Sequence, residues 1–458
     1  MERPIWDMLQ AVAARLSLHM PAARGEAPFG GWDAYRLDTT ELAVTDDLYA
    51  PTGAIARAQA LAAQSAGIAH TLLLHGGSTA GIQAMVLYAA RRGETVILPR
   101  NAHLSALNAC AIAGIEPVFA EPSYTAYGRV FTRNGAYLQA MQKHPGAKAV
   151  LVLRPDYYGL TPDFALVAEQ ARGQGMLVLC DEAHGATFNW RADIKNAGAM
   201  GAQLFVQSAH KTLPALTAGA WLHASREIDV ERLRRILRMV QTSSPSFVGM
   251  ASLDDARAWM DRGGTEACAA LAKDVARFYR RASGLGYAPG QGSAPAGFVY
   301  DCLRLVLDAP QGGYELEAAL REKGIDVEMA DETCIVCILS LLNGATQLDG
   351  LAQALEEMGT PHRKEKERRP SAKVLAPPRE QPQRVMTIGE AAFSPCEAVP
   401  MGEAVGRVSA ANVGLYPPGV ALCTAGECFS QEMVTFLCNT PGKLFGLPYA
   451  GHLLCAII

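Results

Sequence analysis

The stretch that decides the fold is Met176-Leu-Val-Leu-Cys-Asp-Glu-Ala-His-Gly185. Its first five residues are all apolar, which predicts a strand buried on both faces, as in a mostly parallel sheet. Asp181 and His184 follow where this strand should end, and a buried carboxylate is costly unless it pairs with a cation or metal. Open α/β sheets bind their ligands at the carboxyl ends of strands. The stretch therefore predicts an α/β fold with a ligand site that begins at Asp181.

The same pattern continues on both sides of this strand. Short apolar runs alternate with helical stretches from residue 71 to residue 223, which predicts a mostly parallel sheet with helices on both faces. The predicted strands are 71–74, 95–98, 117–120, 147–153, 176–180, 204–206 and 218–222. The predicted helices between them are 80–91, 105–113, 134–143 and 162–173.

Outside this region the sequence predicts smaller parts. Helical spacing favours helices at 1–20, 227–240, 251–261, 264–283, 314–323 and 349–357, and apolar runs favour strands at 298–307 and 333–341. Basic residues interleaved with prolines and glutamates after residue 360 indicate a solvated linker rather than a nucleic-acid patch. The predicted parts are an N-terminal helix and loop (1–35), a large domain (36–285), a smaller αβ domain (286–360), a linker (361–384) and a C-terminal unit (385–458).

Charge and composition restrict the partners. Lysine and arginine number 41 against 45 aspartates and glutamates, a net charge of −4, so nothing in the balance favours nucleic acid or an anionic membrane. The longest apolar run, 334–342, is far shorter than the ~18 residues that span a bilayer. The first residues, with Glu2 and Asp7, lack the pattern of an export signal. We therefore expect a cytoplasmic protein.

The eleven cysteines are irregularly spaced, which favours reduced thiols over a disulfide framework. Cys334 and Cys337 have the spacing of a redox pair or half a metal site. Their surroundings, Cys-Ile-Val-Cys-Ile-Leu, predict a buried strand, and a reactive thiol needs exposure and a lowered pKa. We expect a structural role for both thiols and no metal site.

Two further segments fit the chemistry of Asp181. Gly76-Gly-Ser-Thr-Ala-Gly81 lies between a predicted strand and helix, where glycines and free N–H groups suit a single phosphate, although such a sequence is also ordinary helix capping. Lys211 follows another apolar strand, thirty residues after Asp181, and a lysine among apolar residues can act as an amine nucleophile. Together they match pyridoxal phosphate, in which lysine forms a Schiff base, aspartate pairs with the pyridine nitrogen and a helix end holds the phosphate.

Several segments resemble the Orn/Lys/Arg decarboxylase family, which has the aspartate-aminotransferase-like fold type I of pyridoxal-phosphate enzymes. The resemblance is dense over residues 36–260 and resumes near residues 403 and 416. The chain is similar to the compact form of the family, which has no receiver-like domain before the part that corresponds to residue 1. The segments are Asp38-Thr-Thr-Glu-Leu42, Thr45-Asp-Asp-Leu48, Gly77-Ser-Thr-Ala-Gly81, Pro99-Arg-Asn-Ala-His103, Asp181-Glu-Ala-His-Gly185, residues 208–217, Ser243-Ser-Pro-Ser246, Glu403-Ala-Val-Gly-Arg407 and Tyr416-Pro-Pro-Gly419.

The resemblance implies a role for each matching residue. Lys211 would carry the cofactor, Asp181 would pair with its ring nitrogen, and His103 and Ala183 would pack on the two faces of the ring. The phosphate would be held by Gly77, Ser78, Thr79, Ser208 and His210. Ser243 or Ser244 would add a contact from the neighbouring subunit, because family sites form at a dimer interface. Without the resemblance, His103 would be interpreted as a helix cap and His184 as a hydrogen-bonded strand-end histidine.

The resemblance implies decarboxylation of arginine, lysine or ornithine to a polyamine-type amine and CO2 by a homodimer or larger homo-oligomer. The cationic substrate side chain needs a carboxylate, and the candidates are Glu41, Asp46, Asp47, Asp331 and Glu427. The alternatives are another enzyme of fold type I, an aminotransferase or lyase, and a non-catalytic homologue that binds pyridoxal phosphate.

Three departures from the family pattern bear on the substrate rather than the cofactor. The family's opening Pro-Gly-His-Lys corresponds to Pro21-Ala-Ala-Arg24 here, Leu104 replaces the lysine after His103, and Ala218 replaces a glutamine.

Overall fold

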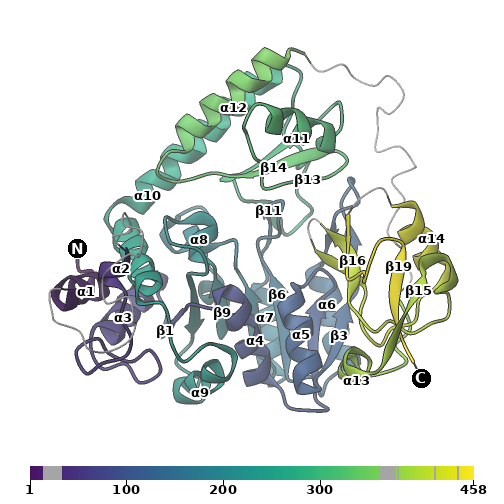
Figure 1. The fold of residues 1–458 in the computed structure, drawn as a ribbon, viewed down its shortest axis with the longest axis horizontal. Coiled ribbons are helices and arrows are strands. Elements are labelled where there is room, and N and C mark those ends of the chain that lie inside the picture. Colours follow the sequence, from purple (N-terminus) through teal and green to yellow (C-terminus); the bar gives the residue numbers. More distant parts are fainter. Residues whose placement is uncertain (14–33, 361–377, 379–380, 417–418, 441–442, 458) are drawn as a thin grey trace. The chain divides into compact units, whose positions relative to one another are not determined.

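The structure is a computed structural model that describes residues 1–13, 34–360, 378, 381–416, 419–440 and 443–457 (Figure 1). The chain divides into two compact units. The first comprises Met1–Tyr88, Val178–Lys273 and Ser340–Gly344, and the second comprises Ala89–Leu177, Asp274–Leu339 and Ala345–Ile458. The domain boundaries expected from the sequence remain a prediction.

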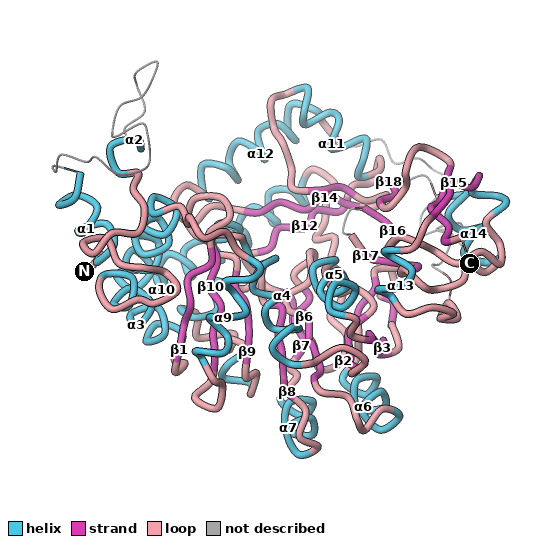
Figure 2. The backbone as a smooth tube through the Cα atoms, turned by 60° about the horizontal axis from the view of Figure 1, so that its bottom comes forward, coloured by secondary structure: helices cyan, strands magenta, loops and turns pink. Residues whose placement is uncertain are grey.

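The first unit is built on strands in the order β1, β10, β9 and β8. Strands β8 and β9 are parallel, whereas β10 runs antiparallel to both of its neighbours. Figure 2 shows β1, β10 and β9 side by side. Their residues are nearly all buried, as expected for strands covered on both faces. The bounds are β1 His70–Leu74, β8 Leu177–Asp181, β9 Leu204–Gln207 and β10 Ala220–Ala224.

The helices of the first unit begin directly after these strands or flank them. Helix α4 follows β1, and the short α8 follows β9. The bounds are α1 Pro4–Ala13, α2 Ala34–Leu37, α3 Ala54–Ala66, α4 Gly77–Ala89, η1 Ala186–Trp190, η2 Gly198–Met200, α8 Ala209–Thr212 and α9 Val230–Val240. Of the helix expected at residues 1–20, residues 4–13 are confirmed, and residues 14–20 lie outside the described residues.

The second unit contains three parallel strands in the order β6, β2 and β3. Their bounds are β6 Ala149–Leu153, β2 Thr95–Pro99 and β3 Glu116–Ala120, and the helices between them are α5 Leu104–Ala113, α6 Asn134–Lys143 and α7 Ala165–Gly173. Short hairpin strands are β4 Ser123–Tyr124 and β5 Val130–Phe131, and β7 Leu160–Pro162 pairs with β11 Phe298–Tyr300.

The rest of the second unit is αβ structure. A small antiparallel sheet has the order β12, β14 and β13, with bounds Arg304–Asp308, Cys334–Ile338 and Met329–Ala330. Helix α11 is Gly313–Glu322, and α12, Gly344–Met358, begins at the unit boundary. The C-terminal part buries Val413, Phe429 and Leu453 among α13 Ile388–Phe393, β15 Cys396–Pro400, η3 Met401–Glu403, β16 Val413–Tyr416, β17 Val420–Cys423, α14 Gln431–Asn439, β18 Lys443–Phe445 and β19 His452–Ala456.

One expected element differs from the structure. The expected strand 298–307 is broken into β11 and β12, because Asp301 turns the chain and its side chain accepts a hydrogen bond from the Leu303 N–H. The two helices expected at 251–261 and 264–283 are confirmed, because Gly263 has non-helical backbone angles and separates the two helical segments of α10 (Phe247–Gly284). Among the described residues, no helix has both the length and the apolar character needed to cross a membrane.

Candidate active site

Asp181 is the last residue of β8, and its side chain is buried. One carboxylate oxygen accepts a hydrogen bond from the Ala183 N–H at 3.1 Å. No cation among the residues that the structure describes pairs with this carboxylate. A buried anion without a counter-charge is unfavourable, so Asp181 is suited to a positively charged ligand group such as a protonated pyridine nitrogen.

Lys211 lies in α8, directly after β9, and its Nζ is 3.1 Å from His184 Nε2. The turns after β8 and β9 are also joined by their backbones, since the Ser208 N–H donates to the Ala183 carbonyl at 3.1 Å. Because β8 and β9 are parallel neighbours, their carboxyl ends meet at one edge of the sheet. The first unit thus brings Asp181, Ala183, Ser208 and Lys211 together, as expected from the sequence.

The interpretation of His184 as a hydrogen-bonded strand-end histidine is confirmed, and its partner, Lys211, makes it a further candidate site residue. It is buried, and its imidazole is the group that lies against the amine of Lys211. The sequence signal was available, because His184 occupies a strand end like Asp181. What spacing alone did not reveal was the tertiary contact with a lysine 27 residues further along the chain.

The turn from Gly76 to Gly81 forms the amino terminus of α4. The first amide groups of a helix have no partner within the helix and favour an anion. The Gly77 N–H is already used, since it donates to the Ala218 carbonyl at 3.0 Å. The hydroxyls of Ser78 and Thr79, in contrast, make no hydrogen bond to any residue that the structure describes. The first turn of α4 therefore offers Ser78 and Thr79 to a phosphate.

Gly81 allows α4 to approach the sheet closely. A Cβ atom at this position would lie 2.7 Å from both Leu74 Cδ1 and Val206 Cγ2, too close for any side chain. The glycine thus sets the helix directly against β1 and β9.

The segment after α9 also reaches this turn, because the Gln241 side chain accepts hydrogen bonds from the backbone of His75 and Gly76 at 3.1 and 3.2 Å.

The remaining expected phosphate ligands lie in the turn after β9. Ser208 Oγ is 3.1 Å from His210 Nδ1, which also lies 3.2 Å from the Gly219 carbonyl. Ser243 and Ser244 follow Gln241 and are exposed on this chain. Their expected contribution to a neighbouring subunit remains a prediction.

His103, in the second unit, caps the amino terminus of α5. Its Nδ1 accepts a hydrogen bond from the Ser105 N–H at 3.2 Å and lies 2.8 Å from Ser105 Oγ. The ring itself is exposed. The capping role is thus confirmed. Stacking of the ring on a cofactor remains a prediction, and the hydrogen bonds to Ser105 leave the ring exposed for it.

Three of the five acidic candidates for the substrate side chain are already bound by two or more groups of the protein. Asp46 accepts hydrogen bonds from the Thr52, Gly53 and Ile55 N–H groups, so it caps α3. Glu427 forms a two-pronged ion pair with Arg100 at 2.7 and 2.8 Å. Of the other two, Asp47 accepts one hydrogen bond, from the Tyr49 N–H at 2.7 Å. Glu41 and Asp47 line a cavity of about 410 Å³ in the first unit, as does Asp46.

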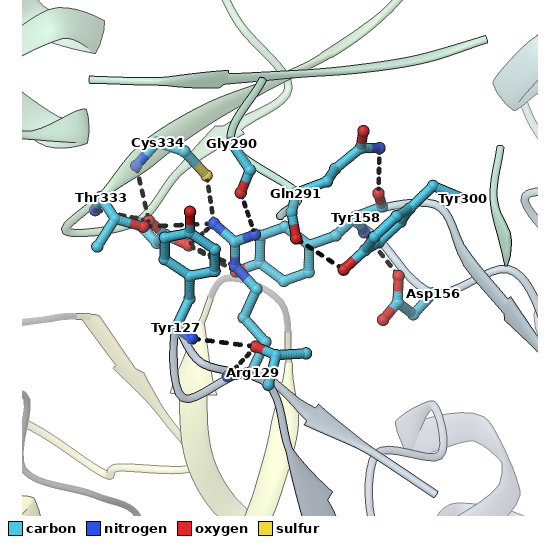
Figure 3. Close-up of polar contacts among 11 residues, drawn as sticks. Tyr127, Arg129, Asp156, Tyr158, Gly290, Gln291, Tyr300, Thr333 and Cys334 are labelled. Atoms are coloured by element: carbon cyan, nitrogen blue, oxygen red, sulfur yellow. Dashed lines mark hydrogen bonds and ion pairs between the residues drawn. The ribbon is translucent and has the colours of Figure 1, made fainter. Parts of the chain in front are cut away.

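The fifth candidate, Asp331, pairs with a buried cluster in the second unit, of which Figure 3 shows Arg129, Tyr158 and Cys334. The guanidinium of Arg129 stacks on the Tyr158 ring at 4.0 Å, pairs with Asp331 at 3.2 Å and donates to Cys334 Sγ at 2.9 Å. Burial raises the pKa of Cys334, and it raises that of Cys337 to about 12. Both thiols therefore stay protonated at neutral pH, which agrees with their expected structural role.

The opening departure, Pro21-Ala-Ala-Arg24, lies outside the described residues. Ala218 has a positive φ of 70°, and its carbonyl is the one that binds Gly77. Leu104 is the first residue of α5. The first unit as described fits pyridoxal phosphate, since it combines an unpaired buried carboxylate, an amine and a helix terminus with free hydroxyls.

Comparisons with known proteins agree with this fit. Residues 18–281 match the model of the Orn/Lys/Arg decarboxylase major domain, and residues 374–441 match that of its C-terminal domain. The chain is 34% identical to the uncharacterized protein YaaO of Bacillus subtilis, over 87% of this chain and 84% of that protein. It is 30% identical to an arginine decarboxylase of the same organism, over 98% of this chain and 95% of the relative.

Solved structures share the fold. The lysine decarboxylase LdcF of Francisella novicida has a TM-score of 0.86 at 16% identity and covers 100% of this chain and 81% of its own. The constitutive lysine decarboxylase of Escherichia coli has a TM-score of 0.84 at 18% identity, over 99% of this chain and 81% of its own. The α/β fold of type I pyridoxal-phosphate enzymes is thus confirmed, and the chain belongs to the Orn/Lys/Arg decarboxylase family of pyridoxal-phosphate-dependent amino-acid decarboxylases.

Proposed function

We propose that this protein decarboxylates a basic amino acid, with arginine as the first candidate, at the site formed by Asp181, His184 and Lys211. The observation that carries the proposal is the 3.1 Å contact of Lys211 with His184 beside the buried, unpaired Asp181. Arginine is favoured over lysine and ornithine because the relative with the widest coverage quoted above is an arginine decarboxylase. The likeness to lysine decarboxylase structures, below 20% identity, supports the fold and leaves the substrate open.

Bound pyridoxal phosphate would supply an electron-accepting ring that makes loss of CO2 from an amino acid feasible. Asp181 would pair with the ring nitrogen and keep it protonated. The first turn of α4, with Ser78 and Thr79, would hold the phosphate together with Ser208 and His210. His103 would lie against one face of the ring and Ala183 against the other.

Lys211 has two tasks in this proposal. Its amine would attach the cofactor, and as a free amine it would be placed to give a proton to the substrate carbon. His184 Nε2, at hydrogen-bond distance from this amine, orients it and can exchange a proton with it. Glu41 and Asp47 are the remaining candidates for binding the cationic end of the substrate.

We further propose that the enzyme works in the cytoplasm as a homodimer or larger homo-oligomer and that its product belongs to polyamine synthesis. The family membership supports these proposals.

The test is to measure CO2 and to identify the product with arginine, lysine and ornithine separately. Decarboxylation yields the corresponding amine, an aminotransferase would yield a keto acid, and a non-catalytic homologue would yield neither. Lys211→Ala should abolish CO2 release and the visible absorbance of the attached cofactor. Lys273→Ala, an exposed lysine on α10 of the same unit, is the matched control. Borohydride that fixed the cofactor to a lysine other than Lys211 would contradict the assignment.

A further inference from the structure

Gln207, the last residue of β9, is fully buried and lies at the centre of a polar network. Its amide nitrogen donates to Glu182 Oε2 at 2.7 Å and lies 3.3 Å from the Gly185 carbonyl. Its amide oxygen accepts a hydrogen bond from Asn189 Nδ2 at 2.8 Å. Every polar atom of this side chain is therefore in use.

A neutral histidine completes the hydrogen bonding of this amide. His223 on β10 is fully buried, and burial lowers its pKa to about 3. A carboxylate only accepts, so the amide nitrogen of Gln207 faces Glu182 and the amide oxygen faces His223 Nε2 at 3.1 Å. A neutral imidazole has one donor and one acceptor nitrogen. Nε2 therefore donates to the amide oxygen, and Nδ1 accepts from the Thr71 hydroxyl at 2.8 Å.

The positions of these residues in the chain give the network its significance. Gln207 directly precedes the turn Ser208–Lys211, and Glu182 lies between Asp181 and His184. The hydrogen bond of 2.7 Å therefore joins the two turns that carry the proposed reacting groups. Stacking of His223 on Phe205, with ring centres 4.4 Å apart, anchors the network to the sheet.

We propose that Gln207 is a positioning residue that holds the turn of Lys211 in register with the turn of Asp181 and His184. This inference rests on the proposed function. A buried network in which every polar group is paired is rigid, and removal of one member leaves the others unpaired. A displacement of about 1 Å in a reacting group can lower a rate about a hundredfold.

The chain offers a closely matched control on the same strand. Gln203, immediately before β9, is also buried, donates to Glu227 Oε2 at 2.7 Å and accepts from the Val178 N–H at 3.1 Å. It differs from Gln207 in lying at the strand end opposite to Lys211. Substitution of either glutamine removes a hydrogen bond to a glutamate, which is buried at Gln207 and partly buried at Gln203. Only the hydrogen bond of Gln207 reaches the turn that carries Asp181 and His184.

The experiment compares Gln207→Glu with Gln203→Glu, and Gln207→Met with Gln203→Met. Each apoprotein is titrated with pyridoxal phosphate, the adduct is fixed with borohydride, and the fraction attached to Lys211 is measured by peptide mass. Melting temperature, kcat and KM are measured on the same samples. We expect the Gln207 variants to need more cofactor for half-maximal attachment and to lose roughly a hundredfold in kcat with little change in KM. The Gln203 variants should keep the attachment curve and kcat of the parent.

Equal loss in both pairs of variants, or a parent-like attachment curve and kcat in Gln207→Met, would overturn the inference. If Gln207→Glu does not fold, Gln207→Met still provides the comparison, because it introduces no charge. The cofactor titration needs no amino-acid substrate. If the parent released no CO2 from any basic amino acid, the proposed function would fail, whereas the titration would still decide the role of Gln207.

Discussion

Asp181 and Lys211 are separated by thirty residues in the chain, yet each follows a strand that ends at the same edge of the sheet. Their functional importance could be predicted from the residue types, because burying a carboxylate or an ammonium group without a partner costs free energy. The contact of Lys211 with His184 could not be predicted, since it depends on the path of two turns. At this scale, sequence identifies the candidates and tertiary structure pairs them.

The first residue-scale prediction concerns Asp181→Asn. The amide keeps the shape of the side chain but loses the charge that would keep the ring nitrogen protonated. Loss of a buried charge partner costs roughly 3–5 kcal/mol, which predicts a fall in kcat of a hundredfold or more. The variant should fold and retain the cofactor on Lys211, as shown by its melting curve and visible absorbance. Turnover near that of the parent would refute the role of Asp181.

The second residue-scale prediction is a pH dependence of stability from His223. A histidine in the unfolded chain titrates near pH 6.5, whereas the pKa of folded His223 is about 3. Between these values only the unfolded state binds the proton, so the stabilisation is complete above pH 6.5 and is lost as the pH falls. Between pH 7.5 and 5 this amounts to about 2 kcal/mol of unfolding free energy.

The measurement is urea unfolding of the parent and of His223→Asn at both pH values. Asp156 acts in the opposite direction, since burial raises its pKa to about 6 and its stabilisation is lost as the pH rises from about 4 to 6. The difference between the two proteins removes this contribution. Equal pH dependence in parent and variant would mean that the pKa of His223 is the same in the folded and the unfolded state.

At the scale of elements, the strands β1, β2, β3, β6, β8, β9 and β10 could be predicted because each contains a run of mostly apolar residues. The short strands β4, β5, β7 and β13 and the strands of the C-terminal part, β15–β19, were not predicted. The strand that was predicted wrongly contains a turn at Asp301 within an apolar stretch. Ion pairs between distant elements gave no sequence signal. Glu427 and its partner Arg100 are 327 residues apart, so the sequence could suggest a substrate contact that the structure assigns to the protein itself.

The element-scale prediction concerns this pair. Arg100 follows β2 and Glu427 follows β17, and both side chains are almost fully buried. Glu427→Gln leaves the guanidinium without its charge partner and should lower the unfolding free energy by roughly 3–5 kcal/mol. The control is Glu397→Gln, which breaks an exposed pair with Arg407 and should have a much smaller effect. Similar denaturation midpoints for both variants would show that burial of the Arg100 pair adds nothing.

At the scale of the whole molecule, family membership predicts site contacts that a single chain does not contain. His103 and Ser243 are both exposed, and the family resemblance assigns them contacts with the cofactor and with a neighbouring subunit. A shared site between two copies would account for the exposure of Ser243.

The last prediction tests that sharing by subunit complementation. If Ser243 of one copy completes the site that contains Lys211 of the other, Lys211→Ala and Ser243→Ala place their defects on different chains. Random mixing into symmetric dimers makes half of the dimers mixed, and each mixed dimer regains one intact site, so about a quarter of the parent's sites should reappear. The readout is CO2 release after the two variants are unfolded and refolded together, compared with each variant refolded alone. If each site lay within one chain, mixing the two defective variants would regain no activity, because every chain would carry a defect in its own site. Mixing Lys211→Ala with the parent would still leave one intact site in each mixed dimer and shows that mixed dimers are active. Absence of recovery from the two variants would therefore place Ser243 outside the partner's site.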